Sequence, residues 1–236
     1  MRRIGLIGGM SWESTALYYQ LINQGVAERL GGLHSADCLL ASVDFATIAR
    51  FQAEDRWDEA GEILAEKART LEAAGADLLV LCTNTMHKVA PALEAGVGIP
   101  LLHIADVTAT AARSAGLTRV GLLGTAFTME QPFYRDRLTA HGLEVVVPDA
   151  PARAQIHRVI FDELCRGIIS ATSREQVRDI VTDLVADGAD GIILGCTEIE
   201  LLIKPEDSPM PLLATTALHA AAAVNAALRE PLPHER

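Results

Sequence analysis

The sequence of 236 residues lacks an excess of basic side chains, a long apolar run and paired cysteines. Its formal net charge of −11 disfavours nucleic acids and anionic membranes as partners, because both attract basic surfaces. No stretch reaches the roughly 18 consecutive apolar residues of a membrane-spanning helix. Four scattered cysteines without a C-x-x-C pair disfavour a disulfide framework or a metal site, and they favour a reducing, cytoplasmic location: Cys38, Cys82, Cys165 and Cys196.

The segment MRRIGLIGGMSWES at the start combines two arginines with a short apolar run. Glycines interrupt that run within a few residues, and it lacks the long apolar region of a secretory signal peptide. The segment therefore reads as a first β-strand. Its glycines follow the spacing G-x-x-G-G rather than G-x-G-x-x-G, which disfavours a nicotinamide-dinucleotide site.

Half of the residues are apolar, which is enough for a sizeable core. Short apolar runs alternate with stretches of helical periodicity, the pattern of an α/β fold with parallel sheets. Glycines end two of the helical stretches, at Gly31 and at Gly75. The capping-box motifs TMEQ and SREQ predict that two further helices begin at Thr128 and Ser173. The runs that read as strands are RIGLIGG, CLLASVDF, DLLVLC, RVGLLG, EVVVP, DGIILGC and MPLLA.

Three segments of the first half recur in the second half in the same order. The pairs are RIGLIGG at Arg3 with RVGLLGT at Arg119, GADLLVLCTNT at Gly75 with GADGIILGCTE at Gly188, and IPLLHIADVTATAA at Ile99 with MPLLATTALHAAAA at Met210. Buried strands can resemble one another by composition, but the shared GAD and PLL go beyond it. We therefore predict a duplicated α/β unit whose two copies face each other across a cleft.

The repeat register ranks two adjacent candidates for a functional side chain, Cys82 and Thr83. The eighth residue after Gly75 is Thr83, and the eighth residue after Gly188 is Cys196. Thr83 and Cys196 are then equivalent and are expected to oppose each other across the cleft. Cys82 precedes Thr83 on its strand, so its side chain points to the other face of the sheet. We favour Thr83 and retain Cys82 as the alternative.

The chemistry that this arrangement favours is proton transfer at carbon. Groups on opposite faces of a substrate can remove a proton from one side and return one to the other. A cysteine suits this task because its pKa, ordinarily about 8.5, responds to local charge. Both motifs lie where a strand meets a helix, and the backbone N–H groups of a helix N-terminus can bind a carboxylate.

At these motifs the sequence resembles the aspartate/glutamate racemase family, the cofactor-independent amino-acid racemases. The matching segments span nearly the whole chain in the family's order: GLIGGMSWEST, CTNTMHK, LGTAFTM and GCTEIELL. The combination of GGMSWEST with CTNTMHK resembles one subgroup of that family. The resemblance implies a small amino-acid substrate, no cofactor, no metal and a homodimer.

The resemblance also implies the domain organisation. It consists of two α/β subdomains related by a pseudo-twofold axis, with the active site in the cleft between them. The chain crosses between the subdomains twice, so residues 1–98 and 210–236 form the first and residues 99–209 form the second.

One departure from the family bears on the mechanism. The family's first motif commonly reads cysteine-asparagine-threonine, and here the same positions are Thr83, Asn84 and Thr85. A threonine hydroxyl is too weak an acid to act like a thiolate at neutral pH. The resemblance therefore makes Cys196 the catalytic base, while Thr83 donates a hydroxyl hydrogen bond or positions a water.

The remaining site residues follow from the resemblance. It implies that the α-carboxylate is held at Asn84, Thr85 and Thr197, with further substrate contacts from Gln52 and Thr125. Met10 and Ser11 are expected in a mobile loop over the cleft.

Three residues keep two interpretations each. Arg166 either binds a side-chain carboxylate, as a guanidinium can with two hydrogen bonds, or is a solvated helix-end arginine. Glu198 either orients the substrate ammonium or only begins a helix. His87, four residues after Thr83, either polarises the site or packs.

Two other functions remain open beside an aspartate, glutamate or broader-range racemase. Decarboxylases of substituted malonates and isomerases of maleate share the scaffold and also use cleft cysteines. A non-catalytic amino-acid-binding protein is the third hypothesis, because the first cysteine of the motif is missing.

Overall fold

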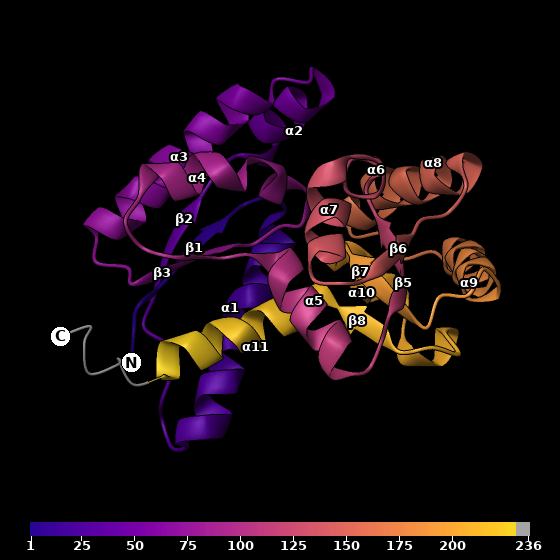
Figure 1. Ribbon diagram of the computed structural model, residues 1–236. Coiled ribbons are helices and arrows are strands. Elements are labelled where there is room, and N and C mark those ends of the chain that lie inside the picture. The colour runs from indigo at the N-terminus through magenta and orange to yellow at the C-terminus, as the bar shows by residue number, and fades with distance from the viewer. Residues whose placement is uncertain (230–236) are drawn as a thin grey trace. The chain divides into compact units, whose positions relative to one another are not determined.

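The computed structural model describes residues 1–229, which form two compact units. The first unit comprises Met1–His103 and the C-terminal segment from His219, and the second unit comprises Ile104–Leu218. Each unit is built around one four-stranded sheet with helices on both faces (Figure 1).

The sheet of the first unit has the strand order β2-β1-β3-β4, and every neighbouring pair is parallel. Its central strands are fully buried because helices cover both faces, whereas the edge strand β2 is half-exposed. The bounds are β1 Ile4–Gly8, β2 Cys38–Ser42, β3 Leu78–Leu81 and β4 Leu101–Leu102.

The sheet of the second unit repeats this plan with the order β6-β5-β7-β8, again parallel throughout. The bounds are β5 Arg119–Gly124, β6 Glu144–Val146, β7 Gly191–Gly195 and β8 Leu212–Ala214. Equivalent strands occupy equivalent places in the two sheets. The predicted α/β fold with two similar parallel subdomains is therefore confirmed.

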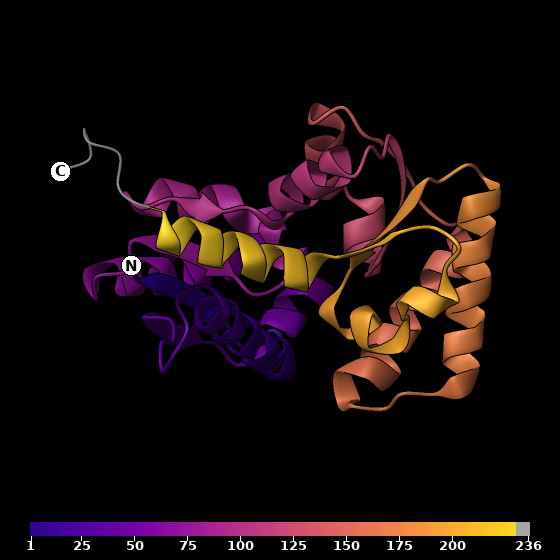
Figure 2. The ribbon, with the colours of Figure 1, turned by 90° about the horizontal axis from the view of Figure 1, so that it is seen from below.

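The helices of the first unit carry apolar side chains towards the sheet. Tyr18, Ile22 and Val26 of α1 are buried together with alanines of α11, and Figure 2 shows these two helices side by side. Gly75, with φ 90°, ends α3 in a conformation that favours glycine, as the sequence predicts. The bounds are α1 Trp12–Leu30, α2 Phe45–Ala53, α3 Trp57–Ala73, the 3₁₀ turn η1 Thr85–Val89, α4 Ala90–Gly96 and α11 Thr215–Leu228.

The helices of the second unit enclose its sheet in the same way. A large apolar cluster joins α8, α9 and α10 to β5 and β7. The bounds are α5 Ile104–Ser114, α6 Ala126–Glu130, α7 Pro132–Ala140, α8 Ala150–Arg158, the π turn η2 Val159–Glu163, the 3₁₀ turn η3 Leu164–Arg166, α9 Ala171–Ala186, α10 Thr197–Leu202 and the 3₁₀ turn η4 Pro205–Asp207.

Two predicted helix starts are wrong by a few residues. The helices predicted to begin at Thr128 and Ser173 begin at Ala126 and Ala171. In each case a hydroxyl three residues upstream is the N-cap: Thr125 accepts from Thr128 N, and Ser170 accepts from Ser173 N. The capping residue therefore precedes the motif that the sequence pattern selected.

The chain passes from one unit to the other at two helices. β4 pairs with β3, so the first crossing follows His103, and α5 then packs in the second unit. β8 pairs with β7, so the return follows β8, and α11 begins in the second unit while its later turns belong to the first. The boundaries predicted at 98/99 and 209/210 precede both crossings because each of these short strands stays with its own sheet.

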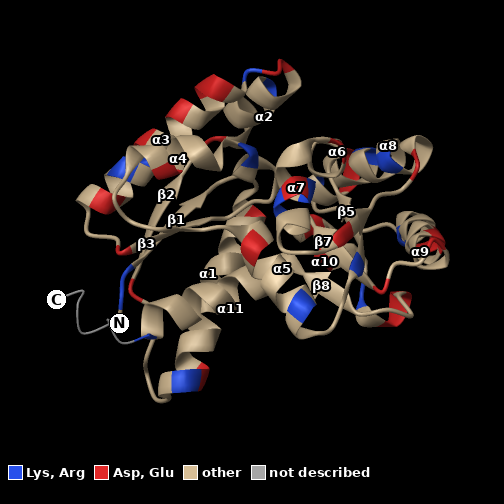
Figure 3. Cartoon of the chain, in the orientation of Figure 1, with Lys and Arg blue, Asp and Glu red and all other residues tan. Residues whose placement is uncertain are grey.

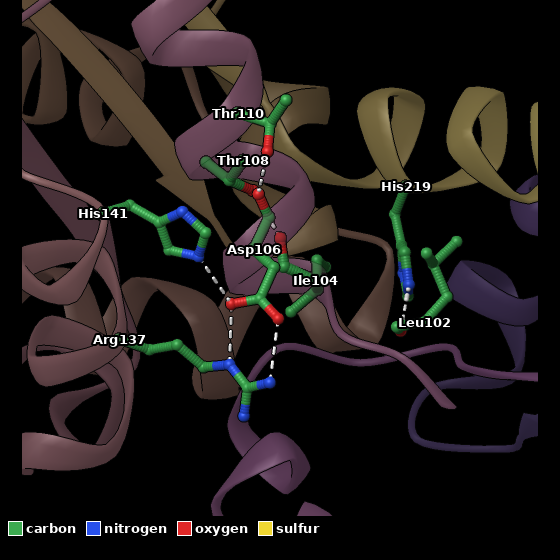
Figure 4. A network of polar contacts seen from close by, with 8 residues as sticks. All are labelled: Leu102, Ile104, Asp106, Thr108, Thr110, Arg137, His141 and His219. Carbon is green, nitrogen blue, oxygen red and sulfur yellow. Dashed lines mark hydrogen bonds and ion pairs between the residues drawn. The ribbon is translucent and has the colours of Figure 1, made fainter. Parts of the chain in front are cut away.

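Charged residues are spread over the helices, and several acidic residues (red) follow one another along α3 (Figure 3). One ion-pair network ties α5 to α7. Arg137 donates two hydrogen bonds to Asp106, at 2.7 and 2.8 Å, and His141 lies 3.0 Å from the same carboxylate (Figure 4). These groups are more than one-third exposed, so their contribution to stability is modest.

Among residues 1–229, no helix combines the length and the apolar character needed to cross a membrane. The same residues hold no cluster of three or more histidine, cysteine or acidic side chains arranged to bind a metal ion.

Candidate active site

The candidate residues gather where the two central strands of each sheet end. In parallel α/β sheets, ligand-binding residues are positioned by the loops that follow the strands at their carboxyl ends. β1 and β3 serve this role in the first unit, and β5 and β7 serve it in the second. Each unit therefore contributes two adjacent strand ends.

The segment after β1 is a tightly packed turn. Gly9 has φ 95°, and a Cβ atom there would lie 2.2 Å from the Val43 carbonyl oxygen, so only glycine fits. Ser11 is the N-cap of α1 and accepts a hydrogen bond from Ser14 N at 3.2 Å. Met10 and Ser11 are 6% and 5% exposed. Both residues thus lie in a packed turn, and a mobile loop over a cleft stays a prediction.

The strand end after β3 separates Cys82 from Thr83. Cys82 is fully buried in the apolar core of the first unit, and its thiol lies 3.8 Å from the Val80 carbonyl oxygen. Burial raises the pKa of this thiol far above its usual range, and the nearby Cys38 raises it further. Thr83, 8% exposed, begins the turn that follows. Cys82 thus lies in the core, and the assignment of Thr83 to the site stays a prediction.

A compact turn carries Thr83, Asn84 and Thr85, all three of which are buried. His87 Nδ1 lies 2.7 Å from the Thr83 carbonyl oxygen, a contact in which the imidazole N–H donates. Gln52 of α2 is buried as well, and its amide donates to the Met86 sulfur at 3.0 Å. The structure thus brings Gln52 to the turn that carries Thr83.

In the second unit the ends of β5 and β7 lie against each other. Gly124 pairs with Gly195, and a Cβ atom on Gly124 would lie 2.9 Å from the Gly195 carbonyl oxygen. Glycine at these positions lets the two strand ends approach closely. The next residues are Thr125, the N-cap of α6, and Cys196, the N-cap of α10. The structure therefore brings these two predicted site residues together.

The Cys196 thiol has an acidic partner. Its Sγ donates to Glu198 Oε2 at 2.9 Å, and the two residues are 6% and 9% exposed. Burial raises the pKa of Cys196 well above its ordinary value, and the Glu198 carboxylate raises it further. The thiol is therefore protonated at rest, with a proton acceptor already in contact.

Thr197 and Arg166 occupy different surroundings. Thr197 is buried, and its hydroxyl oxygen accepts from the Thr216 hydroxyl of α11 at 3.0 Å. Arg166 is exposed at the end of η3, a turn that packs against α10. The guanidinium lies in the same unit as Cys196 and remains open to solvent.

Sequence reasoning missed one half-buried carboxyl group beside these residues. Glu200 lies four residues after Cys196, and burial raises its pKa to about 7. The repeat could have pointed to Glu200, because His87 lies four residues after Thr83 and is therefore equivalent to Glu200. The ionisable side chain is buried at His87 and half-buried at Glu200.

The two strand-end sites, each on a parallel sheet flanked by helices, are those of a two-subdomain α/β protein. The family model described as Asp/Glu/Hydantoin racemase matches residues 7–223, and the chain belongs to this family.

Its relatives span the whole chain. A protein from Yersinia pestis provisionally assigned to the Asp/Glu racemases is 53% identical, with a TM-score of 0.92 over 97% of this chain and 100% of its own. An aspartate racemase homologue from Pyrococcus horikoshii is 33% identical, with a TM-score of 0.83 over the same shares. The broad specificity amino-acid racemase RacX of Bacillus subtilis is 23% identical over 227 residues, which cover 94% of this chain and 96% of RacX.

Proposed function

We propose that the protein is a cofactor-independent racemase of aspartate, glutamate or a broader set of amino acids. The observation that carries this proposal is the buried thiol of Cys196 in contact with the Glu198 carboxylate at 2.9 Å, at a strand end of a chain that belongs to the racemase family. A thiol beside a proton acceptor is suited to removing a proton from carbon.

Cys196 acts as the base that exchanges the Cα proton. Glu198 accepts the thiol proton across their 2.9 Å contact when the substrate binds, and the thiolate then removes the proton from Cα. The carbanion-like state that results is stabilised by backbone N–H groups at the strand ends. Return of a proton to the opposite face completes the inversion, and neither the carbon skeleton nor any redox state changes.

Thr83 serves the opposite face. Its hydroxyl does not ionise near neutral pH, so it delivers a proton by positioning a water or by hydrogen bonding. Cys196 and Thr83 are therefore unequal partners, and the two directions of reaction differ in kcat and in KM. Because the enantiomers have equal free energy, kcat/KM is the same in both directions.

Substrate recognition uses the residues around the two strand ends. The α-carboxylate binds at the turns that carry Asn84, Thr85 and Thr197, and Thr125 and Gln52 complete the pocket. Arg166 binds a side-chain carboxylate, which suits its open guanidinium. Met10 and Ser11 shape the wall after β1. A homodimer, which light scattering after size-exclusion chromatography would detect, is proposed from the family resemblance.

The proposal is tested with a panel of D- and L-amino acids in D₂O. We expect loss of the Cα hydrogen signal by NMR together with formation of the other enantiomer by chiral chromatography. Release of CO₂ from a substituted malonate without such exchange would indicate a decarboxylase instead. Cys196→Ser should abolish exchange, and Cys38→Ser is the matched control because its thiol lies on the edge strand β2.

A further inference from the structure

A buried network joins the turn that carries Cys196 to the first turn of α11. Glu200 Oε1 accepts from Thr216 N at 2.8 Å, and the Thr215 hydroxyl lies 3.4 Å from the same oxygen. The Thr215 hydroxyl also donates to the Leu194 carbonyl oxygen of β7 at 2.8 Å. Strand β7 and helices α10 and α11 are thereby linked through side chains.

The same network reaches the residue next to Cys196. The Thr216 hydroxyl donates to Thr197 Oγ1 at 3.0 Å, so Thr216 uses its backbone for Glu200 and its side chain for Thr197. Thr215 and Thr216 are both fully buried. Hydrogen bonds among buried groups are costly to break, so this network fixes the start of α10 relative to α11.

The first unit contains an equivalent contact at the equivalent position. His87 donates to the Thr83 carbonyl oxygen, and its ring meets the His103 ring edge-on, with ring centroids 4.5 Å apart and an interplanar angle of 63°. His103, which His87 contacts, is the residue just before α5, and Thr216, which Glu200 contacts, lies in the first turn of α11. In each unit, the side chain four residues after the candidate catalytic position therefore contacts a residue at the start of the helix by which the chain crosses over.

From this geometry we propose that Glu200 is a positioning residue, which holds the Cys196-bearing turn in its active arrangement by anchoring α10 to the first turn of α11. The inference rests on the proposed racemase function, but its structural content concerns the turn itself. Glu200 acts through Thr216 and Thr197 and is not assigned a contact with substrate.

The charge of Glu200 matters to this role. A carboxylate accepts a stronger hydrogen bond than a neutral acid, and negative charge is favoured at the N-terminus of α11. The ionisable groups around it are Glu198 on the same helix, Tyr134 of α7, and Lys204, whose ammonium donates to the Glu200 carbonyl oxygen at 2.8 Å. Burial raises the pKa of Glu200 to about 7, so this carboxyl group changes its charge near neutrality, and the hydrogen bonds from Thr216 and Thr215 favour its ionised form.

The test uses the full-length protein with Glu200→Gln, Glu200→Ala and the control Glu175→Gln, an exposed glutamate of α9. Labelling of Cys196 by iodoacetamide is followed by peptide mass spectrometry, with Cys38 as the internal reference. Loss of one buried hydrogen bond should speed Cys196 labelling in Glu200→Ala by at least about fivefold, because the turn opens more often. Labelling of Cys38 should stay unchanged.

Racemisation gives a second, independent measurement. The wild type should show an ionisation near pH 7 in kcat, and Glu200→Gln should lose that ionisation while keeping most of its activity, because the amide still accepts from Thr216 N. If Glu200→Ala does not fold, the pH dependence of kcat in Glu200→Gln tests the positioning role instead.

The outcomes are separable. Wild-type labelling of Cys196 in folded Glu200→Ala, or a neutral-pH ionisation that survives in Glu200→Gln, would overturn the positioning role. If the wild type racemises no amino acid, the proposed function fails, and the labelling experiment still decides whether Glu200 holds the turn.

Discussion

The two strand ends that follow β3 and β7 occupy the same place in two copies of one fold and yet differ in chemistry. After β7, a thiol donates to a carboxylate, and a second carboxyl group accepts from α11. After β3, a hydroxyl replaces the thiol, and an imidazole donates to the backbone. The two sheets therefore share one strand order, while the side chains at the equivalent strand ends differ in acid–base character.

The side chain proposed as the base, Cys196, belongs to the second unit. Cys196 has a proton acceptor in contact, whereas Thr83 has a hydroxyl that stays protonated near neutral pH. Removing the Cys196 thiol should therefore have the largest effect on activity. We expect Cys196→Ala to lower kcat/KM for racemisation by about 10²- to 10⁴-fold, the usual worth of an acid–base group. Activity equal to that of Cys38→Ala would contradict the assignment.

The next largest effect is expected at His87, the first unit's counterpart of Glu200. His87→Ala removes the donor to the Thr83 carbonyl oxygen and leaves space beside His103. Displacement of the turn should lower kcat by roughly tenfold or more, since catalytic geometry tolerates little movement. Steady-state kinetics in both directions measure it, with the exposed His34→Ala as control. An unchanged kcat would show that His87 only packs.

Replacing Thr83 by cysteine gives both strand ends a thiol and so tests whether the missing thiol limits one direction of the reaction. A thiol at this position supplies the acid–base group that threonine lacks. We expect kcat in the slower direction to rise by about tenfold, with kcat/KM still equal in both directions. Full progress curves from each pure enantiomer measure both values. A fall in both directions would indicate that position 83 requires a hydroxyl.

Glu200 of the second unit titrates near pH 7, whereas burial lowers the pKa of His219 in the first unit to about 4. The pKa of Glu200 is about 7 in the fold, against 4.5 ordinarily, so the folded state holds this proton more tightly than the unfolded state. The contribution of Glu200 to the stability of the wild type should therefore decrease as the pH rises from 4.5 to 7, by up to about 3 kcal/mol.

Glutamine stays neutral between pH 4.5 and 7, so Glu200→Gln does not lose this stability. The melting temperature of Glu200→Gln, relative to the wild type, should rise between pH 4.5 and 7 and level off above it. Differential scanning fluorimetry across the range measures this difference. Parallel pH curves for the two proteins would mean that the carboxyl group titrates normally.

The smallest effect is expected at Cys82, the neighbour of Thr83. Its side chain lies in the apolar core, so Cys82→Ala should cost about 1 kcal/mol of stability and leave kcat nearly unchanged. Urea denaturation and racemisation assays measure the two effects separately. Complete loss of activity in a folded variant would show that Cys82, rather than Thr83, serves the site.

Much of the fold was predictable because it depends on local patterns. Fully buried parallel strands appear as continuous apolar runs, and glycines with positive φ mark helix ends such as Gly75. The internal repeat predicted the equivalence of Thr83 and Cys196, and the matching orders of the two sheets agree with it. Helix starts were less predictable, since hydroxyl residues at both Thr125 and Thr128 compete for the role of N-cap.

The class of fold and the two similar halves were readable from the sequence alone, because both appear as residue spacing along continuous segments. Only the tertiary structure decided that Met10 and Ser11 are buried, that Glu198 contacts the thiol and that Glu200 holds α11. These features depend on burial, on side-chain direction and on which distant segments meet, and a free energy of burial exists only once the chain has folded.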